Sequence, residues 1–405
     1  MMTSNSDPTN GNTNGHIRKR PVQSTSLDLK KTILLPNPLK ILASIDGYFQ
    51  DAAMLKGFHD YWNVVAPQLQ QILLSYLNGA FKFMGVSLNG VPKGTLIPPV
   101  EHLPKYERVV KRLFEILENA ECVLYQDSRY VRHTATLPSE GTSSRLIDTL
   151  VADHPQFEVD ARMMAVTGPR LGECLTGKVD PLSLMFREPA ASQVLADFYL
   201  HSPIFATLTE HMVSLLGPLL NSADRGADKP LKIIEVGAGL GGTTSRLIEF
   251  IQAMGVPVEY TFTDISPSLV KRASTKYKEH SEWMRFTTFD MEKSVPNALS
   301  GKYHVVIGTM AVHATSSRSQ SCSRLYELLC DGGFLLLSEG TQRIDWYDIT
   351  FGLLDGWWLS GDYALQPADV WMQNFREAGF QEVGYSSGPS REANTQQLLL
   401  AWKKV

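Results

Sequence analysis

Apolar and polar positions follow different rhythms in the two halves of this chain. Before about residue 220 the apolar residues recur at helical spacing. The clearest case is the stretch 106–117, in which charged side chains fall on the opposite side. From Lys229 onward, short apolar runs of strand length alternate with helical segments, which is typical of a doubly wound α/β domain. The pattern predicts a mostly helical region over 39–224 and an α/β domain over 225–405.

Seven strands are expected in the α/β half. They span 232–236, 259–263, 284–289, 303–308, 334–338, 382–385 and 396–402. A helix follows the first strand and runs from Thr243 to about Met254, and Pro267 marks the start of a helix after the second strand. The last two strands form an antiparallel hairpin. This arrangement favours the Rossmann-like sheet of a class I methyltransferase over the sheet of a dehydrogenase.

The helical half contains a second unit with its own pattern. The helix over 106–117 is followed directly by two short strands, Cys122–Tyr125 and Arg129–His133, which predict a hairpin and thus a winged-helix-like unit. Such units often bind DNA, but no stripe of Lys and Arg accompanies this one, so it favours a lid or dimerisation role. Residues 1–38 are rich in Ser, Thr, Asn, Pro and Gly and are expected to form a disordered linker. Its basic cluster Arg18–Arg20 is expected to be solubilising rather than a nuclear signal or a binding tail.

Composition narrows the functional classes. Of 405 residues, 43% are hydrophobic and 20% are charged, as in a globular protein with enough core for two or three domains. The net charge of −4 argues against a nucleic-acid partner, and no uninterrupted apolar run reaches the length of a membrane span, so no membrane partner is expected. The N-terminus lacks the apolar region of a secretory signal. The four cysteines have no C-x-x-C spacing, so we expect free thiols in the reducing cytoplasm and no metal site.

A glycine-rich turn follows the first strand of the α/β half. The run Ile233–Thr244 passes from β-branched residues into glycines and then into a helix. Glycines let the backbone approach a ligand closely, and the amides at a helix N-terminus bind polar groups, so a nucleotide-like cofactor is predicted here. The glycines satisfy the G-x-G-x-G of methyltransferases and also, with Gly242 as the third glycine, the dinucleotide pattern, so by themselves they leave the cofactor open. The cofactor-binding candidates of this segment are Glu235, Gly237, Gly239 and Gly241.

Ligands of an open α/β sheet bind at the carboxyl ends of its strands, so the residues there are further cofactor candidates. Asp264 lies 27 positions beyond Gly237, where a ribose-binding carboxylate is expected, although an acidic residue at a strand end is also a common helix N-cap. Asp290 and Met291, after the next strand, suit an adenine, with a carboxylate for its amino group and an apolar side chain for its ring face. Two more residues at strand ends complete this set, Ile265 and Met310.

Two strand ends also carry a candidate catalytic pair, His313 and Glu339. Adjacent strand ends face the same cleft, so a carboxylate there can hold one imidazole nitrogen and leave the other as a general base. A lone histidine in such a loop is more often structural, but the pair together is suited to removing a proton from an activated carbon. Aromatic residues after the fifth strand suit an extended, partly apolar substrate, although some are expected to be core. The substrate-binding candidates are Trp346, Trp357 and Trp358.

Taken together, these segments resemble the C-methyltransferase domain of polyketide synthases, and within that family the fungal non-reducing class. The resemblance extends from about Leu39 to the C-terminus. The segments that carry it are Ile233–Thr244, Tyr260–Ser266, Phe289–Met291, the His313 loop, Ser338–Thr341 and Gly352–Trp358, with Leu175–Phe186 and Phe198–Pro203 upstream.

This resemblance implies the transfer of a methyl group from S-adenosyl-L-methionine to the α-carbon of a β-keto thioester, with S-adenosyl-L-homocysteine as product. The acyl chain would be tethered through phosphopantetheine to an acyl carrier protein domain. The family's His–Glu base falls on His313 and Glu339, and a tyrosine at the lid, which contacts the cofactor or polarises the substrate, falls on Tyr199. The chain would then be one domain of a larger synthase, whose other domains would be its partners.

Three other interpretations stay open. An O-methyltransferase acting on a free phenol would use the same fold and a histidine base. A non-catalytic docking module would have the fold without the chemistry, although the intact glycines, Asp264, Asp290, His313 and Glu339 argue against degeneration. A nicotinamide dehydrogenase is the least favoured interpretation, and it would bind NAD in place of S-adenosylhomocysteine.

Overall fold

The computed structural model of this protein describes residues 33, 35–45, 47–223 and 229–404. The basic cluster Arg18–Arg20, most of the predicted linker and the predicted boundary at 224/225 lie outside the described residues. Within the described part, Ile33 is buried against the core and the first helix begins at Pro38. Packed structure thus begins ahead of residue 38.

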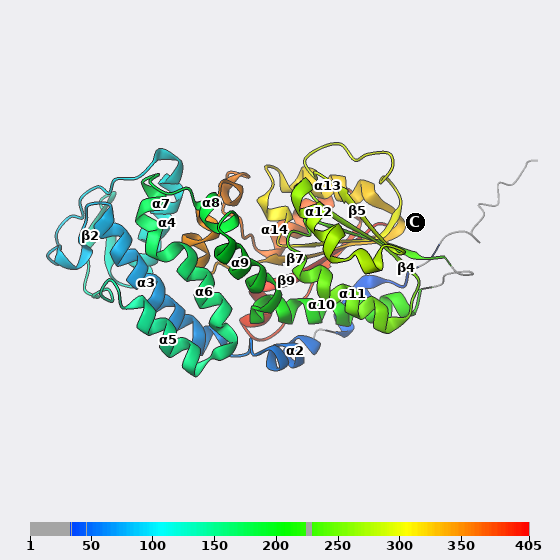
Figure 1. Ribbon diagram of the computed structural model, residues 1–405, viewed down its shortest axis with the longest axis horizontal. Coiled ribbons are helices and arrows are strands. Elements are labelled where there is room, and N and C mark those ends of the chain that lie inside the picture. The colour runs from blue at the N-terminus through cyan, green and yellow to red at the C-terminus, as the bar shows by residue number, and fades with distance from the viewer. Residues whose placement is uncertain (1–32, 34, 46, 224–228, 405) are drawn as a thin grey trace, which may run out of the picture. The chain divides into compact units, whose positions relative to one another are not determined.

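A seven-stranded sheet forms the centre of the α/β half, in the order β5-β4-β3-β6-β7-β9-β8 (Figure 1). The strands from β5 to β7 in this order are parallel, and β9 is antiparallel to both β7 and β8. This confirms the predicted class I methyltransferase sheet with its antiparallel end. The chain order reverses between β3 and β6, which places a ligand site at the carboxyl ends of these strands. The strands are β3 (Leu231–Val236), β4 (Val258–Asp264), β5 (Met284–Thr288), β6 (Tyr303–Thr309), β7 (Leu329–Gly340), β8 (Glu382–Tyr385) and β9 (Gln396–Trp402).

Alternate residues of the central strands enter two separate hydrophobic cores. Ile233 and Ile234 are adjacent in β3, yet they belong to different cores, and the same alternation separates Leu398 from Leu399 in β9. Because both faces of the sheet are covered, the central strands need apolar residues at nearly every position. In Figure 1, α10 and α11 lie below the strands and α13 lies above them. The helices around the sheet are α10 (Pro203–Asn221), α11 (Gly242–Met254), α12 (Pro267–Lys276), α13 (Arg318–Leu328) and α14 (Ala368–Glu377).

The helical half contains the predicted winged-helix elements. α4 (Glu107–Asn119) buries its apolar face, and β1 (Val123–Gln126) pairs antiparallel with β2 (Arg129–Arg132). The turn between the two strands has a φ of +48° at Asp127 and +61° at Ser128, as a type I′ hairpin turn requires. The other helices of this half are α1 (Pro38–Ser44), α2 (Tyr48–Lys56), α3 (Ala66–Phe83), α5 (Ser143–Asp153), α6 (Glu158–Thr167), α7 (Leu171–Leu175), α8 (Pro181–Phe186) and α9 (Pro189–His201).

Helix α10 joins the helical half to the sheet. α10 is long and apolar enough to cross a membrane by length and composition, and among the described helices it alone has this property, although Glu210, Gly217 and Pro218 interrupt its apolar sequence. It contacts α2, α11 and β9, and 61% of its most apolar stretch is buried inside the protein. Its apolar character is therefore that of a core helix with neighbours on several sides.

Candidate active site

The glycine loop leaves the end of β3 in a left-handed backbone conformation. The φ angle is +60° at Gly237, +56° at Gly239 and +80° at Gly241, in a region that side chains disfavour. Space is also short, because a Cβ atom added at Gly237 would lie 2.5 Å from the Cβ of Ala311. The loop therefore permits a close backbone approach that only glycine allows, and α11 begins directly after it.

The side chain of Glu235, on β3, forms hydrogen bonds to two neighbouring elements of secondary structure. Its side chain is almost fully buried, at 2% exposure. The hydroxyls of Thr244, in the first turn of α11, and of Tyr260, on β4, both donate hydrogen bonds to its Oε2 atom, the second at 2.6 Å. Burial raises the pKa of Glu235 to about 7, against the opposing effect of these two hydroxyls. The carboxyl group thus connects β3, β4 and the start of α11.

Asp264 binds the glycine loop directly. Its Oδ2 atom accepts a hydrogen bond from Gly239 N at 3.0 Å, and its Oδ1 atom accepts one from Ser266 N at 2.8 Å. Both carboxylate oxygens therefore accept hydrogen bonds from backbone amides, and Asp264 joins the loop to the turn before α12. Its contact with a ribose stays a prediction. Ile265, the next residue in the chain, is 64% exposed and offers an uncovered apolar side chain.

Asp290 and Met291 follow β5 at the next strand end. Asp290 accepts a hydrogen bond from Glu292 N at 3.0 Å and pairs with Lys293 at 3.0 Å. Partial burial favours the neutral acid, but the Glu292 amide and Lys293 hold the pKa of Asp290 below its ordinary value. The Cε atom of Met291 lies 3.8 Å from the position that a Cβ at Gly237 would take. The structure therefore brings Met291 against the glycine loop.

A cavity of about 200 Å³ is lined by the glycine loop and by helices of the N-terminal half. Helix α9 comes so close to the loop that a Cβ at Gly242 would lie 2.8 Å from the carbonyl oxygen of Tyr199. The helical half thus covers the loop as a lid. Besides the loop, the lining comprises Phe186, Leu195, Tyr199, Phe205, Glu235, Thr243, Leu269, Thr309 and Met310. Five predicted cofactor residues are described but are not part of this lining: Gly241, Asp264, Ile265, Asp290 and Met291.

His313 and Glu339 are in direct contact. His313 lies in the 3₁₀ helix η8 (Val312–Ala314) after β6, and Glu339 lies at the end of the neighbouring strand β7. The Nδ1 atom of His313 is 2.7 Å from Oε2 of Glu339, while Oε1 accepts hydrogen bonds from Ala311 N at 3.1 Å and Val312 N at 2.9 Å. Glu339 is fully buried, and these contacts engage both oxygens of its carboxyl group. The contact at Nδ1 leaves Nε2 as the nitrogen for a substrate.

A second cavity, of about 150 Å³, adjoins His313. Apart from His313 its lining is aromatic or apolar, and it consists of Tyr199, Phe205, Met310, Ala314, Tyr347, Phe351, Leu354, Gly356 and Trp357. Tyr199, Phe205 and Met310 also line the glycine-loop cavity, so the two cavities share these three side chains. Met310 has a φ of +47°, which is rare for a residue with a side chain and is an outlier of the kind that gathers at functional sites.

Tyr199 keeps its phenolic proton in this setting. Burial raises the pKa of Tyr199, and the negative charge of Glu339 raises it further. Its hydroxyl is therefore a hydrogen-bond donor at neutral pH, and Tyr199 is part of the lining of both cavities.

The three predicted substrate tryptophans have different surroundings. Trp357, in η11 (Asp355–Trp358), lines the second cavity, and its ring meets that of His313 edge-on at 5.7 Å between centroids. Trp346 is buried in the core, where its Nε1 atom donates to the hydroxyl of Tyr61 at 3.4 Å. Trp358 donates to the carbonyl of Gly352 at 2.8 Å. Only the first of the three is part of the cavity lining.

Sequence analysis did not select three aromatic residues that line the second cavity: Phe205 on α10, Tyr347 in η9 (Asp345–Ile349) and Phe351 in η10 (Phe351–Leu353). The available signals were the aromatic cluster after the fifth strand and the position of Phe205 just past the Phe198–Pro203 segment. These signals locate the region, but they do not tell which rings face a cavity.

Comparisons with known proteins agree with this architecture. Residues 44–130 match a family model described as a methyltransferase helix-turn-helix domain, and residues 234–335 match a methyltransferase domain. The structure is similar to that of the CMeT domain of the citrinin polyketide synthase, with a TM-score of 0.87 and 30% sequence identity, over 90% of this chain and 97% of that one. The chain belongs to the carbon-methyltransferase domain family of polyketide synthases.

Longer relatives contain a similar stretch. The chain is 43% identical over 381 residues, 93% of its length, to the non-reducing polyketide synthase atr1 of Stereocaulon alpinum, of which it spans 15%. It is 36% identical over 359 residues, 88% of its length, to the methylphloroacetophenone synthase of Cladonia uncialis, of which it spans 14%. The CurJ carbon methyltransferase shares the fold, with a TM-score of 0.78 at 22% identity over 91% of this chain and 100% of that one. The chain therefore spans about one seventh of the curated relatives it matches.

As a member of this family, the domain is an S-adenosyl-L-methionine-dependent carbon methyltransferase. The glycine loop fits that cofactor, because its left-handed glycines form a cradle that side chains would fill. Glu235 adds an ionisable carboxyl group to the lining of the same cavity.

Proposed function

We propose that this domain methylates the α-carbon of a β-keto thioester that is carried by an acyl carrier protein. One observation supports the proposal above all others. The hydrogen-bonded pair His313–Glu339 adjoins a cavity that shares Tyr199, Phe205 and Met310 with the glycine-loop cavity. A candidate base and a cofactor cavity are thus separated by only a few side chains, as methyl transfer to a deprotonated carbon requires.

The proposed base is the Nε2 atom of His313. Two flanking carbonyl groups acidify the α-carbon, and Nε2 takes its proton while Glu339 stabilises the imidazolium through Nδ1. The electron pair left on carbon forms the new bond to the methyl group, and the carbon–sulfur bond breaks with its electrons passing to sulfur. S-adenosylmethionine supplies this methyl group as a sulfonium, and S-adenosylhomocysteine is the product. The proton on His313 then passes to solvent.

Tyr199 is proposed to stabilise the negative charge that develops on a substrate oxygen. Its hydroxyl is protonated and the residue lines both cavities, which suits donation to an enolate oxygen or contact with the cofactor. The second cavity has no charged side chain besides the His313 pair, so it suits a neutral acyl chain, with Trp357 against that chain. Trp346 and Trp358 are not needed in this arrangement.

The remaining predicted residues are assigned to the cofactor. Glu235 is proposed to bind the amino group of the methionine part, and Asp264 the ribose. Ile265 and Met291 are proposed to offer apolar surface for the two faces of the adenine, because the first is exposed directly after Asp264 and the second lies against the loop. Asp290 is proposed to accept from the adenine amino group.

We further propose that the domain acts within a larger synthase in the cytoplasm, with the other domains of that synthase as partners. The chain spans only 15% of the synthase from Stereocaulon alpinum, which supports its place within a larger synthase. Three free cysteines are buried, Cys122, Cys174 and Cys322, which is consistent with a reducing compartment.

Mass spectrometry of a carrier protein loaded with a β-keto acyl chain tests the proposal. Incubation with S-adenosylmethionine should add the mass of one methylene, located by fragmentation on the α-carbon. His313→Ala should lower this rate by about 10³-fold or more, while the affinity for S-adenosylhomocysteine in a calorimetric titration stays nearly unchanged. Retained turnover, or lost cofactor affinity, would contradict the assignment of the base. Methylation of a free phenol without carrier protein would instead indicate an O-methyltransferase, and cofactor binding without any methyl transfer would indicate a docking module.

A further inference from the structure

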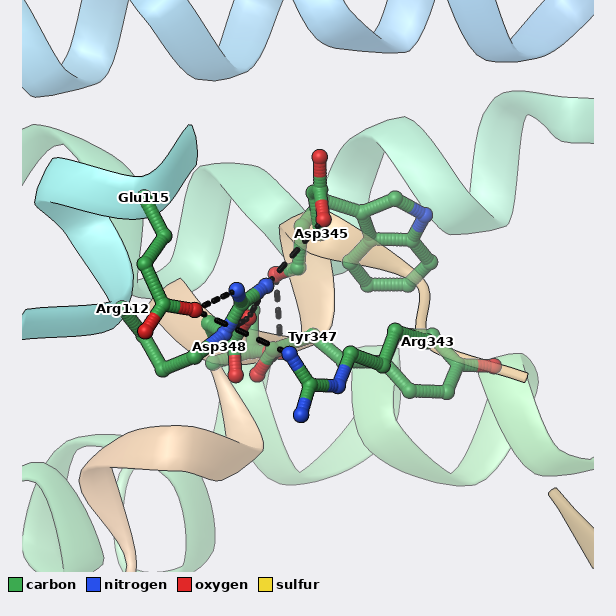
Figure 2. A network of polar contacts seen from close by, with 8 residues as sticks. Arg112, Glu115, Arg343, Asp345, Tyr347 and Asp348 are labelled. Carbon is green, nitrogen blue, oxygen red and sulfur yellow. Dashed lines mark hydrogen bonds and ion pairs between the residues drawn. The ribbon is translucent and has the colours of Figure 1, made fainter. Parts of the chain in front are cut away.

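A buried arginine of the helical half binds the segment that forms one wall of the second cavity (Figure 2). Arg112 lies on α4 and is 6% exposed. Its Nε and Nη2 atoms donate to Oδ2 of Asp348 at 3.2 and 2.9 Å, and Nη2 also donates to Asp345 at 3.2 Å. Both aspartates belong to η9, which lies more than two hundred residues further along the chain. Figure 2 also shows Glu115, which pairs with both Arg112 and Arg343.

Arg112 binds the cavity wall on both sides of Tyr347, through Asp345 and Asp348. This tyrosine lies between the two aspartates in η9 and lines the cavity beside His313. Its ring meets those of Phe351 and Trp357, both also on the lining, at 5.3 and 6.3 Å between centroids. A residue that holds η9 therefore determines where three rings of the wall lie.

A second line of contacts leads from Arg112 toward the base. The guanidinium lies 5.5 Å from the centre of the Tyr363 ring, which meets Trp357 edge-on at 5.7 Å. Trp357 in turn meets His313 edge-on at 5.7 Å. Helix α4 also reaches η11 directly, since Arg108 donates to the carbonyl of Trp358 at 3.3 Å.

A contribution to folding stability does not by itself explain the buried ion pair between Arg112 and Asp348. Replacing a buried ion pair by apolar side chains is often neutral or stabilising, because removing two charges from water costs about as much as their attraction gains. What an arginine fork adds is geometry, since its donors meet a carboxylate in a fixed orientation. Here the geometry is imposed on Asp348, which is fully buried and adjacent to Tyr347.

We propose that Arg112 is a positioning residue for methyl transfer: it holds η9 and Tyr363 and so fixes the aromatic wall that faces His313. The inference rests on the proposed role of His313. Arg112 itself touches neither cavity lining, so it acts through Asp348, Tyr347 and Trp357.

Arg112→Lys tests the inference, because it keeps the charge and loses the fork. The matched control is Arg132→Lys, since Arg132 is also buried in the helical half, at 4% exposure, but donates to the carbonyls of Leu88, Cys122 and His133. We expect Arg112→Lys to lower kcat for the carrier-bound substrate by about 10- to 100-fold, with the affinity for S-adenosylhomocysteine unchanged. The control should lose thermal stability but keep its kcat. Equal effects of the two variants on kcat, or no effect of Arg112→Lys, would overturn the proposal.

Asp348→Asn provides a second variant if Arg112→Lys does not fold, because the amide retains the shape of the carboxyl group. It should reproduce the fall in kcat. Hydrogen exchange then separates this inference from the proposed function. Amides of 345–358 should exchange faster in Arg112→Lys and Asp348→Asn than in the wild type and in Arg132→Lys, whatever the substrate is. Wild-type protein that fails to methylate the carrier-bound chain would refute the proposed function, whereas unchanged exchange over 345–358 would refute the role of Arg112.

Discussion

The glycine-loop cavity and the aromatic cavity beside His313 are neighbours, but they are built in different ways. One wall of the first is a run of consecutive residues whose backbone sets its form, as the φ of +60° at Gly237 and the hydrogen bond from Gly239 to Asp264 show, and side chains of α8, α9 and α10 complete it. The second is assembled from side chains of α9, α10 and the 3₁₀ turns that follow β6 and β7. A cavity formed by backbone tolerates few substitutions, whereas a cavity formed by side chains can acquire a new lining on the same fold. The fold thus determines the proposed cofactor site closely and leaves the proposed substrate site free to vary.

The largest effect on turnover is expected from Glu339→Gln, because this change alters which nitrogen of His313 carries the proton. The amide oxygen can still accept from Ala311 N and Val312 N, but the amide nitrogen would donate to Nδ1 of His313. The imidazole would then carry its proton on Nε2, which could no longer act as a base. We expect turnover of the carrier-bound substrate to fall by about 10³-fold with cofactor affinity retained, measured by single-turnover mass spectrometry and calorimetry. Turnover close to wild type would show that the pair is structural.

The next effect addresses the backbone-built cavity, through Gly237→Ala. The added methyl would collide with Ala311 at 2.5 Å and would also force a side chain into a left-handed conformation. The control is Gly255→Ala, because Gly255 has a similar φ of +62° but nothing lies within 4 Å of an added Cβ. We expect Gly237→Ala to weaken S-adenosylhomocysteine binding by about 10- to 100-fold, and both variants to lose about 1 kcal/mol of stability. Equal affinities in a calorimetric titration would mean that the loop is not the cofactor cradle.

A smaller effect concerns the pH dependence of stability at Glu235. Burial raises its pKa in the folded state from 4.5 to about 7, so the folded protein holds this proton more tightly than the unfolded chain does. The contribution of this group is therefore fully present below about pH 4.5 and is lost as the pH rises through about 7. We expect the free energy of unfolding of the cofactor-free wild type to lose about 3 kcal/mol more over this range than that of Glu235→Gln.

Urea unfolding at a series of pH values measures the difference. Addition of S-adenosylmethionine should weaken this dependence, because its amino group would favour the ionised carboxyl group. Parallel pH profiles for wild type and Glu235→Gln would contradict the assigned burial effect.

The smallest effect on cofactor affinity is expected from a substitution of the exposed residue Ile265. Because Ile265 is 64% exposed, Ile265→Ser should leave the melting temperature nearly unchanged. Loss of its apolar contact with the adenine should weaken cofactor affinity by about threefold to tenfold. Leu359→Ser is a suitable control, since Leu359 is 49% exposed and is not part of either cavity lining. Equal calorimetric affinities for the two variants would remove Ile265 from the cofactor site.

Local pattern predicted the backbone part of the first cavity. The glycine loop and the strands on either side of it are short-range features, and the predicted strands lie within a few residues of the observed ones. Asp264 and Asp290, which were also predicted at the strand ends, are not part of the lining. The neighbourhood of His313 and Glu339 followed from a topological rule, because β6 and β7 are adjacent parallel strands whose ends share an edge. The direct hydrogen bonds from Asp264 to the loop could not be predicted, since they depend on the angle at which the loop folds back.

The second cavity was predicted only as a region. Trp346 and Trp357 look alike in sequence, yet the first is packed against the core and the second faces the cavity, because successive 3₁₀ turns aim their side chains in different directions. Arg112 and Asp348 are far apart in the chain, and nothing in either local sequence predicts their pairing.

The fold class, the glycine loop and a pair of residues suited to proton removal could be predicted from the sequence, since each of them depends on short-range spacing or on strand order. The folded arrangement was needed to see which aromatic rings line the second cavity, how α9 covers the glycine loop and which buried charge binds η9. These features arise from contacts between distant segments, and such contacts depend on packing geometry rather than on spacing along the chain.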